Sequence, residues 1–537
     1  TNLITALATA YADSIPLIAI TGQVNSNLLG RDVFQEADMR GSTESFVKYS
    51  YLVKSADDIP RIFKEAFYIA STGRKGPVLI DIPCDVQIDL LKKSFDYTSE
   101  VNIRGYKPST KGNNPQMHKV VAAINKAKKP LICAGGGVIL GNGEECVRQF
   151  CEKNNIPLVT TMMGIGVMPK NHPLYFGMLG NNGKPYANRA VANSDLLIIA
   201  GARIADRAVP KPENLEQQVN IIHIDIDTAE IGKNLGPTIP LVGDIKSIFD
   251  RLLQENISID TSNWIETLQD IKKSTVDHRV FSDKLVNPML LVQHLSEKMD
   301  DDAIYVADVG QNQLWSADNY VMKNGRFLTS GGMGTMGYSI PAGIGAKMCT
   351  PDKQVVVVCG DGSFQMTSEE LAAAFLDHAP VKIAILNNSV YGMVRQWQTL
   401  FYEHHYSQTN LLDGEAHGAD GAAALADGDA PLEVPDFIKL AEAYGCVGIR
   451  AFTEEEAIAA IEKANQINDR PVLIDFRVWK DAMVWPMVAA GAPNDEVTYK
   501  PGIKPLAGGT PAPGTGPDEH ATGVFEHETA AATASEH

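Results

Sequence analysis

Two polar side chains, Asp361 and Asn388, each follow an apolar run long enough to form a buried strand. The runs cover residues 355–359 and 381–386. The segment between them predicts a helix, with Thr367 placed to begin a capping box. A strand, a crossover helix and a second parallel strand bring both strand ends to one edge of a sheet. We therefore expect the Asp361 carboxylate and the Asn388 amide to lie close together, in the crevice where open α/β sheets bind ligands.

The chemistry that this pair favours is that of a magnesium site. One carboxylate and one amide oxygen suit Mg²⁺ that takes its other ligands from water, a backbone carbonyl and a bound phosphate. Gly360 and Gly362 permit backbone angles that a side chain forbids, and the amide groups near Ser363 offer donors for a phosphate at the start of a helix. The alternative is a tight turn with a solvated Asp361. A second strand follows at the distance of one βαβ unit and ends in Asn387-Asn388, and this combination favours the ligand site over the turn.

The Gly-Asp-Gly turn at 360–362 and the pair Asn387-Asn388 together resemble the diphosphate-anchoring motif of thiamine-diphosphate enzymes. The next segment, 391–397 (YGMVRQW), resembles the acetohydroxyacid synthase (acetolactate synthase) large subunit, and the resemblance covers the chain as far as about Pro486. It implies an α/β fold with three doubly wound parallel-sheet domains, the first one incomplete. It also implies three cofactors, which are thiamine diphosphate, Mg²⁺ and FAD.

The resemblance divides the chain into four parts. Residues 1–100 would be the remainder of a pyrimidine-binding domain, 101–285 a central FAD-binding domain, and 286–486 the domain that binds the diphosphate and Mg²⁺. The third domain carries an acidic insert at 413–433, which we expect to be flexible. Residues 487–537 are rich in Pro, Gly, Ala and Thr and are acidic, so we expect a disordered tail.

Apolar runs alternate with helical patterns along the first three parts, which favours parallel sheets. The triglycine at 135–137 follows one such run and permits the close approach of a cofactor phosphate, but it also suits a simple tight turn, because the G-x-G-x-x-G spacing is missing. The strands we expect cover residues 15–20, 77–82, 130–134, 156–160, 196–200, 221–226 and 304–307.

The resemblance assigns the binding of thiamine diphosphate to turns that follow the predicted strands of the third domain. Met336 matches the apolar residue that props the cofactor into its bent shape, and Gly334 would offer a carbonyl to the aminopyrimidine. Asn312 stands where a His is frequent. Mg²⁺ would be held by Asp361, Asn388 and the backbone carbonyl of Val390. The thiamine-diphosphate set is Gly310, Gln311, Asn312, Gly334, Met336, Asp361, Gly362 and Ser363.

The resemblance also implies a substrate channel. Gln35 would lie near the reacting centre, or it belongs to an ordinary surface loop. Arg207 would hold a 2-keto acid carboxylate through a bidentate fork, or it forms an ordinary ion pair with Asp206. Trp397 matches the residue that favours 2-oxobutyrate over pyruvate. The channel set is Phe34, Gln35, Lys48, Arg207, Met393 and Trp397.

FAD would bind the central domain by the same resemblance. Arg74 would reach it from the preceding domain. The full set is Arg74, Gly136, Thr161, Met162, Met163, Gly164, Leu179, Gly180, Gly201, Ala202, Arg203, Asp225, Ile226, Asp244 and Ile245.

The activity implied is the decarboxylation of pyruvate and its ligation to a second pyruvate or to 2-oxobutyrate. We expect a homodimer or tetramer with active sites between subunits, and a regulatory small subunit as partner. The glutamate that activates the cofactor in this superfamily would lie upstream of Thr1, so no catalytic residue is assigned and we expect little activity from the 537-residue chain alone. Two alternatives stay open, which are a thiamine-diphosphate oxidase or decarboxylase of pyruvate and a non-catalytic assembly partner.

Composition narrows the classes of partner. The formal net charge of −18 argues against nucleic acid and against an anionic membrane. No run approaches the roughly 20 apolar residues of a membrane helix. The seven cysteines form no C-x-x-C pair and read as reduced thiols, so we expect a cytoplasmic protein.

Overall fold

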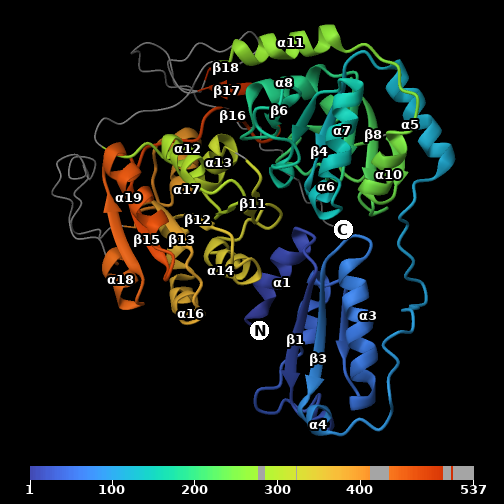
Figure 1. Ribbon diagram of the computed structural model, residues 1–537, viewed down its shortest axis with the longest axis vertical. Helices are drawn as coiled ribbons and strands as arrows, with labels where there is room; N and C mark the ends of the chain where they lie inside the picture. The colour runs from blue at the N-terminus through green and yellow to red at the C-terminus, as the bar shows by residue number, and fades with distance from the viewer. Residues whose placement is uncertain (237, 276–284, 322, 412–434, 500–509, 512–537) are drawn as a thin grey trace, which may run out of the picture.

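The computed structural model describes residues 1–236, 238–275, 285–321, 323–411, 435–499 and 510–511. Three α/β bodies are visible in Figure 1, with the first (blue) joined to the second (cyan and green) by a long extended segment. The predicted insert at 413–433 lies outside the described residues. None of the helices in the described ranges has the length and the apolar character that crossing a membrane requires.

The first sheet is parallel and is covered on both faces. Its central strand, β3, is buried at all seven positions. Val78, Ile80 and Ile82 pack toward α3, whereas Leu79 belongs to a second cluster with residues of α1 and α2. The order is β1-β3-β2, with β1 (Leu17–Gln23), β3 (Pro77–Pro83), β2 (Tyr49–Leu52), α1 (Leu3–Ala12), α2 (Met39–Thr43), α3 (Ile59–Ser71) and α4 (Cys84–Ile88).

The second sheet has six parallel strands in the order β6-β5-β4-β7-β8-β9. One face packs on α5, α7 and α10, and the other on α8 and α11. Its elements are β4 (Pro130–Ala134), β5 (Leu158–Thr160), β6 (Tyr175–Met178), β7 (Leu196–Ala200), β8 (Asn220–Asp225), β9 (Ile239–Val242), α5 (Asn114–Lys126), α6 (Gly136–Leu140), α7 (Glu144–Asn154), α8 (Pro185–Asn193), α9 (Pro212–Glu216), α10 (Ile245–Leu252) and α11 (Ser262–Lys273).

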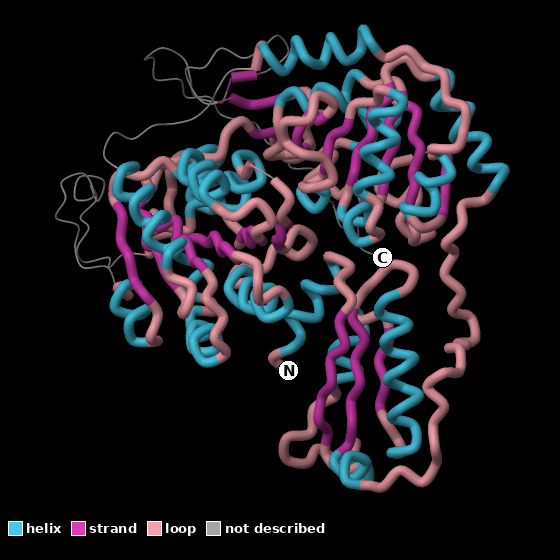
Figure 2. The backbone as a smooth tube through the Cα atoms, viewed as in Figure 1, coloured by secondary structure: helices cyan, strands magenta, loops and turns pink. Residues whose placement is uncertain are grey.

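The third sheet is also parallel, with six strands in the order β11-β10-β12-β13-β15-β14. Helices α12, α13 and α19 cover one face and α14, α16 and α18 the other (Figure 2). Its elements are β10 (Ile304–Ala307), β11 (Arg326–Thr329), β12 (Val355–Gly360), β13 (Lys382–Asn387), β14 (Val447–Ala451), β15 (Val472–Arg477), α12 (Pro288–Lys298), α13 (Gln311–Asn319), α14 (Ser339–Cys349), α15 (Asp361–Gln365), α16 (Leu371–Leu376), α17 (Gly392–Phe401), α18 (Phe437–Ala443) and α19 (Glu454–Gln466). The predicted fold class of doubly wound parallel sheets is confirmed.

Two local predictions are wrong. The helix after β12 begins at Asp361 itself, and Thr367 caps nothing, because its hydroxyl donates to the Gly337 carbonyl at 2.9 Å. Residues 487–499, expected to be disordered, contain β16 (Met487–Val488) and β17 (Val497–Tyr499), and β17 pairs with β18 (Thr510–Pro511). The rest of the predicted tail, 500–509 and 512–537, lies outside the described residues.

The ordered part of the predicted tail returns to the second domain, as Figure 1 shows in red beside the green helices. The backbone N–H of Val488 donates to the Asn181 carbonyl at 2.6 Å. The Asn494 amide donates to Asn188 Oδ1 and to the Ala208 carbonyl. Tyr499 is fully buried. Hydrogen bonds to the second domain and a few buried apolar residues thus order a segment whose average composition is that of a disordered chain.

Candidate active site

A cleft with an empty volume of about 480 Å³ opens where β10, β12 and β13 end. Parallel neighbouring strands end at the same edge, so the turns after them line one space. Met336 enters from the glycine-rich turn at 331–337, and Met393 comes from the first turn of α17. The predicted residues that line the cleft are Gly310, Gln311, Asn312, Met336, Asp361, Gly362, Ser363, Asn388, Val390 and Met393. The sequence prediction thus named residues that the fold brings together, and their contacts with ligands remain predictions.

Asp361 has the strongest electrostatic signal in this cleft. Its side chain is only 4% exposed, and one oxygen accepts from the Gly362 N–H at 3.0 Å. The other oxygen, Oδ2, is buried without a hydrogen-bond partner among the described residues. Burial raises the pKa of Asp361 to about 7, although the N–H groups of Gly362 and Ser389 and the charge of Arg477 oppose the rise. A buried carboxylate oxygen without a partner is costly, and a cation would satisfy it.

Asn388 stands opposite in the turn that follows β13. Its Oδ1 accepts from the Val390 N–H at 3.2 Å, and its Nδ2 lies 3.4 Å from Gln311 Oε1. No group of three or more His, Cys, Asp or Glu side chains within the described ranges can hold a metal ion. A cation in this cleft would therefore use a mixed set of carboxylate, amide and carbonyl oxygens, which Mg²⁺ accepts together with water and phosphate.

The cleft also offers a place for an anion. Helices α13 and α15 both begin at its wall, and unpaired N–H groups at helix starts favour phosphate. Gly310 has φ +134°, a conformation open to glycine. A Cβ on Gly362 would lie 2.6 Å from the Tyr391 ring, so this position also requires glycine. The Asn312 amide donates to the Asp308 carbonyl at 2.8 Å, which ties it to the end of β10.

Asp308 is a functional candidate that the sequence prediction missed. It is fully buried and accepts from the N–H groups of Gly337 and Ser339 at 3.0 and 2.9 Å. Burial raises the pKa of Asp308. Through these bonds it fixes the glycine-rich turn that carries Gly334, with φ +70°, and Met336. The available signal was an acid directly after the apolar strand at 304–307.

The channel residues of α17 lie near the cleft. Met393 lines it, and Trp397 follows four residues later on the same side of the helix. Trp397 packs against Phe401 with ring centroids 5.2 Å apart.

The other channel residues lie elsewhere. Phe34 is 88% exposed in the first domain, beside Gln35 with φ +62°. Arg207, in the second domain, is 70% exposed and its Nε lies 3.9 Å from Asp206 Oδ2. An exposed ion pair of that length contributes little, on the order of 0–1 kcal/mol. None of these three lines the cleft of its own chain.

Lys48 lies at the other end of the first sheet from Gln35, and its role in the channel stays a prediction. The backbone N–H of Lys48 donates to the Pro77 carbonyl, at the amino end of β3. Gln23 pairs with the carboxyl end of the same strand, and its side chain donates to the Ala37 carbonyl, two residues from Gln35. The Lys48 ammonium donates to the Thr72 carbonyl at 2.8 Å and to the Tyr106 hydroxyl at 2.9 Å. Burial lowers the pKa of Lys48 to about 8. Its partners show that it ties the extended interdomain segment to the first sheet.

The predicted FAD residues of the second domain all follow its strands. The segments are 136 after β4, 161–164 after β5, 179–180 after β6, 201–203 after β7, 225–226 at the end of β8 and 244–245 after β9. They therefore share the carboxyl edge of one sheet. Burial raises the pKa of Asp225 to about 6.

Two details of this edge differ from a simple cofactor cradle. A Cβ on Gly135 would lie 2.3 Å from the Gly201 carbonyl oxygen, so close packing of two turns already explains the triglycine. Arg74 is already engaged, because its guanidinium donates to Glu230 at 2.6 Å and to Asp227 at 3.3 Å. Arg74 thus joins the first domain to the second.

Comparison with known proteins places the whole architecture. Residues 308–476 match the family model described as thiamine pyrophosphate enzyme, C-terminal TPP binding domain. Residues 117–252 match its central domain and residues 1–42 its N-terminal TPP binding domain. The acetolactate synthase of Mycobacterium leprae is 44% identical over 514 residues, which cover 94% of this chain and 79% of the relative.

The chain belongs to the acetolactate synthase large-subunit family.

Other members of this family extend the match. The acetolactate synthase large subunit of Corynebacterium glutamicum is 44% identical over 95% of this chain and 80% of its own length. The probable acetolactate synthase large subunit of Methanocaldococcus jannaschii is 41% identical over 91% and 81%. The cleft at Asp361, together with Met393 and Trp397, lies within the part that matches the C-terminal TPP binding domain. The predicted family and enzyme class are confirmed.

Proposed function

We propose that this acetolactate synthase family member decarboxylates pyruvate and joins the remaining two-carbon unit to a second 2-keto acid. A second pyruvate gives 2-acetolactate, and 2-oxobutyrate gives 2-aceto-2-hydroxybutyrate, both for branched-chain amino-acid biosynthesis. The observation that carries the proposal is the cleft inside the matched TPP-binding domain. It joins Asn388 to a buried Asp361 oxygen that has no hydrogen-bond partner in the described part of the chain. Bound thiamine diphosphate supplies the electron sink that lets a 2-keto acid lose carbon dioxide.

The chain's own groups would hold the cofactor by its diphosphate. Asp361, Asn388 and the Val390 carbonyl would bind Mg²⁺, which neutralises the diphosphate. The orphan oxygen of Asp361 supports this assignment, because burying it without a cation is costly. The starts of α13 and α15 would donate N–H groups to the remaining phosphate oxygens.

Apolar side chains would position the reacting end and exclude water from it. Met336, Leu386 and Met393 line the cleft. The Asp308 carboxylate holds the turn beneath Met336 through Gly337. A dry cleft strengthens every electrostatic interaction inside it and limits side reactions with water.

FAD is proposed for the carboxyl edge of the second sheet. Three buried polar atoms on or beside this edge have no hydrogen-bond partner in the described part of the chain, namely Asn181 Oδ1, His223 Nδ1 and Glu230 Oε2. All three are acceptors, since His223 Nε2 donates to the Ala202 carbonyl, and acceptors suit the hydroxyl and amino donors of a dinucleotide's ribose and adenine. A yellow protein whose colour is released by heat as free flavin would support the proposal. A colourless protein that takes up no added FAD would refute it.

The assembly and its location are proposals as well. Phe34 and Gln35 are exposed on the first domain, which supports an active site completed by a second copy in a homodimer or tetramer. A regulatory small subunit is proposed as a further partner. All seven cysteines are free, which supports a reducing compartment, the cytoplasm.

The test is the identity of the product. The gene product is incubated with pyruvate, thiamine diphosphate and Mg²⁺, with and without 2-oxobutyrate, and the products are separated by chromatography. We expect 2-acetolactate from pyruvate alone and 2-aceto-2-hydroxybutyrate as well when 2-oxobutyrate is present. Acetaldehyde or acetyl phosphate as the main product would replace the proposal with a decarboxylase or an oxidase. Absence of thiamine-diphosphate binding would replace it with an assembly role.

A further inference from the structure

The loop at 387–390 carries two of the proposed Mg²⁺ ligands in a strained conformation. Ser389, between Asn388 and Val390, has φ +60°. This left-handed region is uncommon for a residue with a Cβ and is unfavourable for it. Such a conformation persists only where the surroundings hold it, so the contacts of the loop show what holds it.

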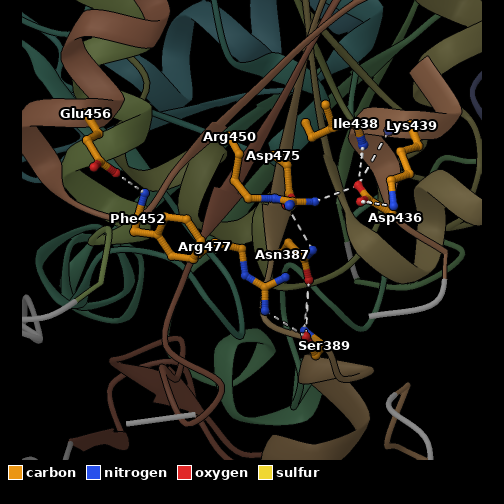
Figure 3. Close-up of polar contacts among 10 residues, drawn as sticks. All are labelled: Asn387, Ser389, Asp436, Ile438, Lys439, Arg450, Phe452, Glu456, Asp475 and Arg477. Atoms are coloured by element: carbon orange, nitrogen blue, oxygen red, sulfur yellow. Dashed lines mark hydrogen bonds and ion pairs between the residues drawn. The ribbon is translucent and has the colours of Figure 1, made fainter. Parts of the chain in front are cut away.

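One contact runs to β15, the strand beside β13. Asp475 is fully buried there, and its Oδ1 accepts from the Asn387 Nδ2 at 2.9 Å (Figure 3). Its Oδ2 accepts from Arg450 Nε, also at 2.9 Å, and Arg450 Nη2 donates to Asp436 at 2.8 Å. The Arg450 charge compensates the buried carboxylate, which would otherwise be costly.

The bond to Asp475 fixes which way the Asn387 amide points. Only the amide nitrogen can donate to a carboxylate, so Asn387 Oδ1 is left to face Ser389. It accepts from the Ser389 N–H at 3.2 Å.

A second contact runs from the same strand to the same residue. Arg477 lies opposite Asn387 in the sheet, and its Nη2 donates to Ser389 Oγ at 3.2 Å (Figure 3). Arg477 is buried, so its side chain has little freedom to move away from the loop. Asp475 and Arg477 thus reach the loop from two positions of one strand.

We propose that Asp475, acting through Asn387, and Arg477, acting through Ser389, are positioning residues that hold the 387–390 loop so that Asn388 and Val390 face Mg²⁺. A buried charge network of this kind is weak evidence for stability, because apolar residues often serve the fold as well. This network contacts the loop that carries Asn388 and Val390, so we assign it the role of holding that loop. The inference rests on the proposed Mg²⁺ site.

The test measures the Mg²⁺ concentration that half-saturates thiamine-diphosphate binding, read from tryptophan fluorescence, since Trp315 lines the cleft. Asn387→Ala removes the amide that links Asp475 to Ser389. Loss of such an outer-shell contact typically weakens metal affinity by roughly 10–100-fold, and we expect a shift of that size. Ser389→Gly is the variant that should fold without strain, because glycine adopts φ +60° freely. It loses the hydroxyl held by Arg477, and we expect a smaller shift in the same direction.

Asn465→Ala is the matched control. Asn465 also makes two side-chain hydrogen bonds, to the Lys298 carbonyl and to Gln354, but at the amino end of the same sheet. We expect it to lower the melting temperature without changing the Mg²⁺ requirement. If both loop variants keep the wild-type Mg²⁺ requirement, the inference is overturned while the proposed site stands. If thiamine-diphosphate binding by the wild type needs no Mg²⁺, both are overturned.

Discussion

The raised pKa of Asp361 predicts how the free energy of unfolding of the cofactor-free protein changes with pH. Its pKa rises from 3.8 to about 7, mainly because the carboxylate is buried. A group with a raised pKa stabilises the fold fully below its unfolded pKa, and that contribution is lost as the pH rises through the folded pKa. At about 1.4 kcal/mol for each pH unit, the wild type should lose roughly 3 kcal/mol through this group between pH 5 and pH 8.

Asp361→Asn removes that loss. The variant places an amide in the same pocket, and the amide carries a desolvation cost that is the same at every pH. We therefore expect the stability of Asp361→Asn relative to the wild type to increase by roughly 3 kcal/mol from pH 5 to pH 8. The measurement is the unfolding of both proteins in EDTA at the two pH values. A stability difference that does not change with pH would refute the reasoning.

Added thiamine diphosphate and Mg²⁺ should stabilise the wild type more than Asp361→Asn. With thiamine diphosphate and Mg²⁺ at 100 times the dissociation constant, the wild type gains about 2.7 kcal/mol by mass action. Asp361→Asn should gain almost nothing, because the metal has lost its one charged ligand. An equal gain in both proteins would show that Asp361 does not bind the cation.

Three further predictions follow from single sites. Gly392→Ala would place a Cβ 2.1 Å from Gln311 Oε1 and 2.8 Å from Asn388 Nδ2, so Mg²⁺-dependent cofactor binding, measured by fluorescence, should weaken at least about tenfold. Burial raises the pKa of Asp13 to about 6, so in Asp13→Asn the fall in melting temperature between pH 4 and pH 7 should be smaller than in the wild type. Trp397→Leu should lower the preference for 2-oxobutyrate over pyruvate, in mixed-substrate product ratios, by roughly tenfold or more.

Where apolar runs and turn residues act locally, the sequence predicted the structure well. The strands at 130–134, 196–200 and 304–307 have the predicted bounds, because each is a buried run ended by a turn. Asp361 and Asn388 meet in one cleft because a crossover between two parallel strands brings both carboxyl ends to the same edge of the sheet.

The errors arise where long-range contacts decide. The role of Lys48 stays a prediction, because Lys48 directly precedes β2 and no local pattern shows at which end of the sheet it will lie. The segment 487–499 is ordered by contacts with the second domain, about 300 residues earlier in the chain. Asp475 shows the same limit, because its bond to Asn387 depends on the register of two strands that are separated by α17, the insert, α18, β14 and α19.

Formation of the new carbon–carbon bond is the central claim, and isotope labelling tests it directly. The gene product is given pyruvate labelled with carbon-13 at C2, together with thiamine diphosphate and Mg²⁺, and the reaction is followed by carbon NMR. Ligation of two pyruvates makes the two labelled carbons neighbours, so the account predicts a product with carbon–carbon coupling, absent with Asp361→Asn. Labelled acetaldehyde, acetate or acetyl phosphate without that coupling would contradict it.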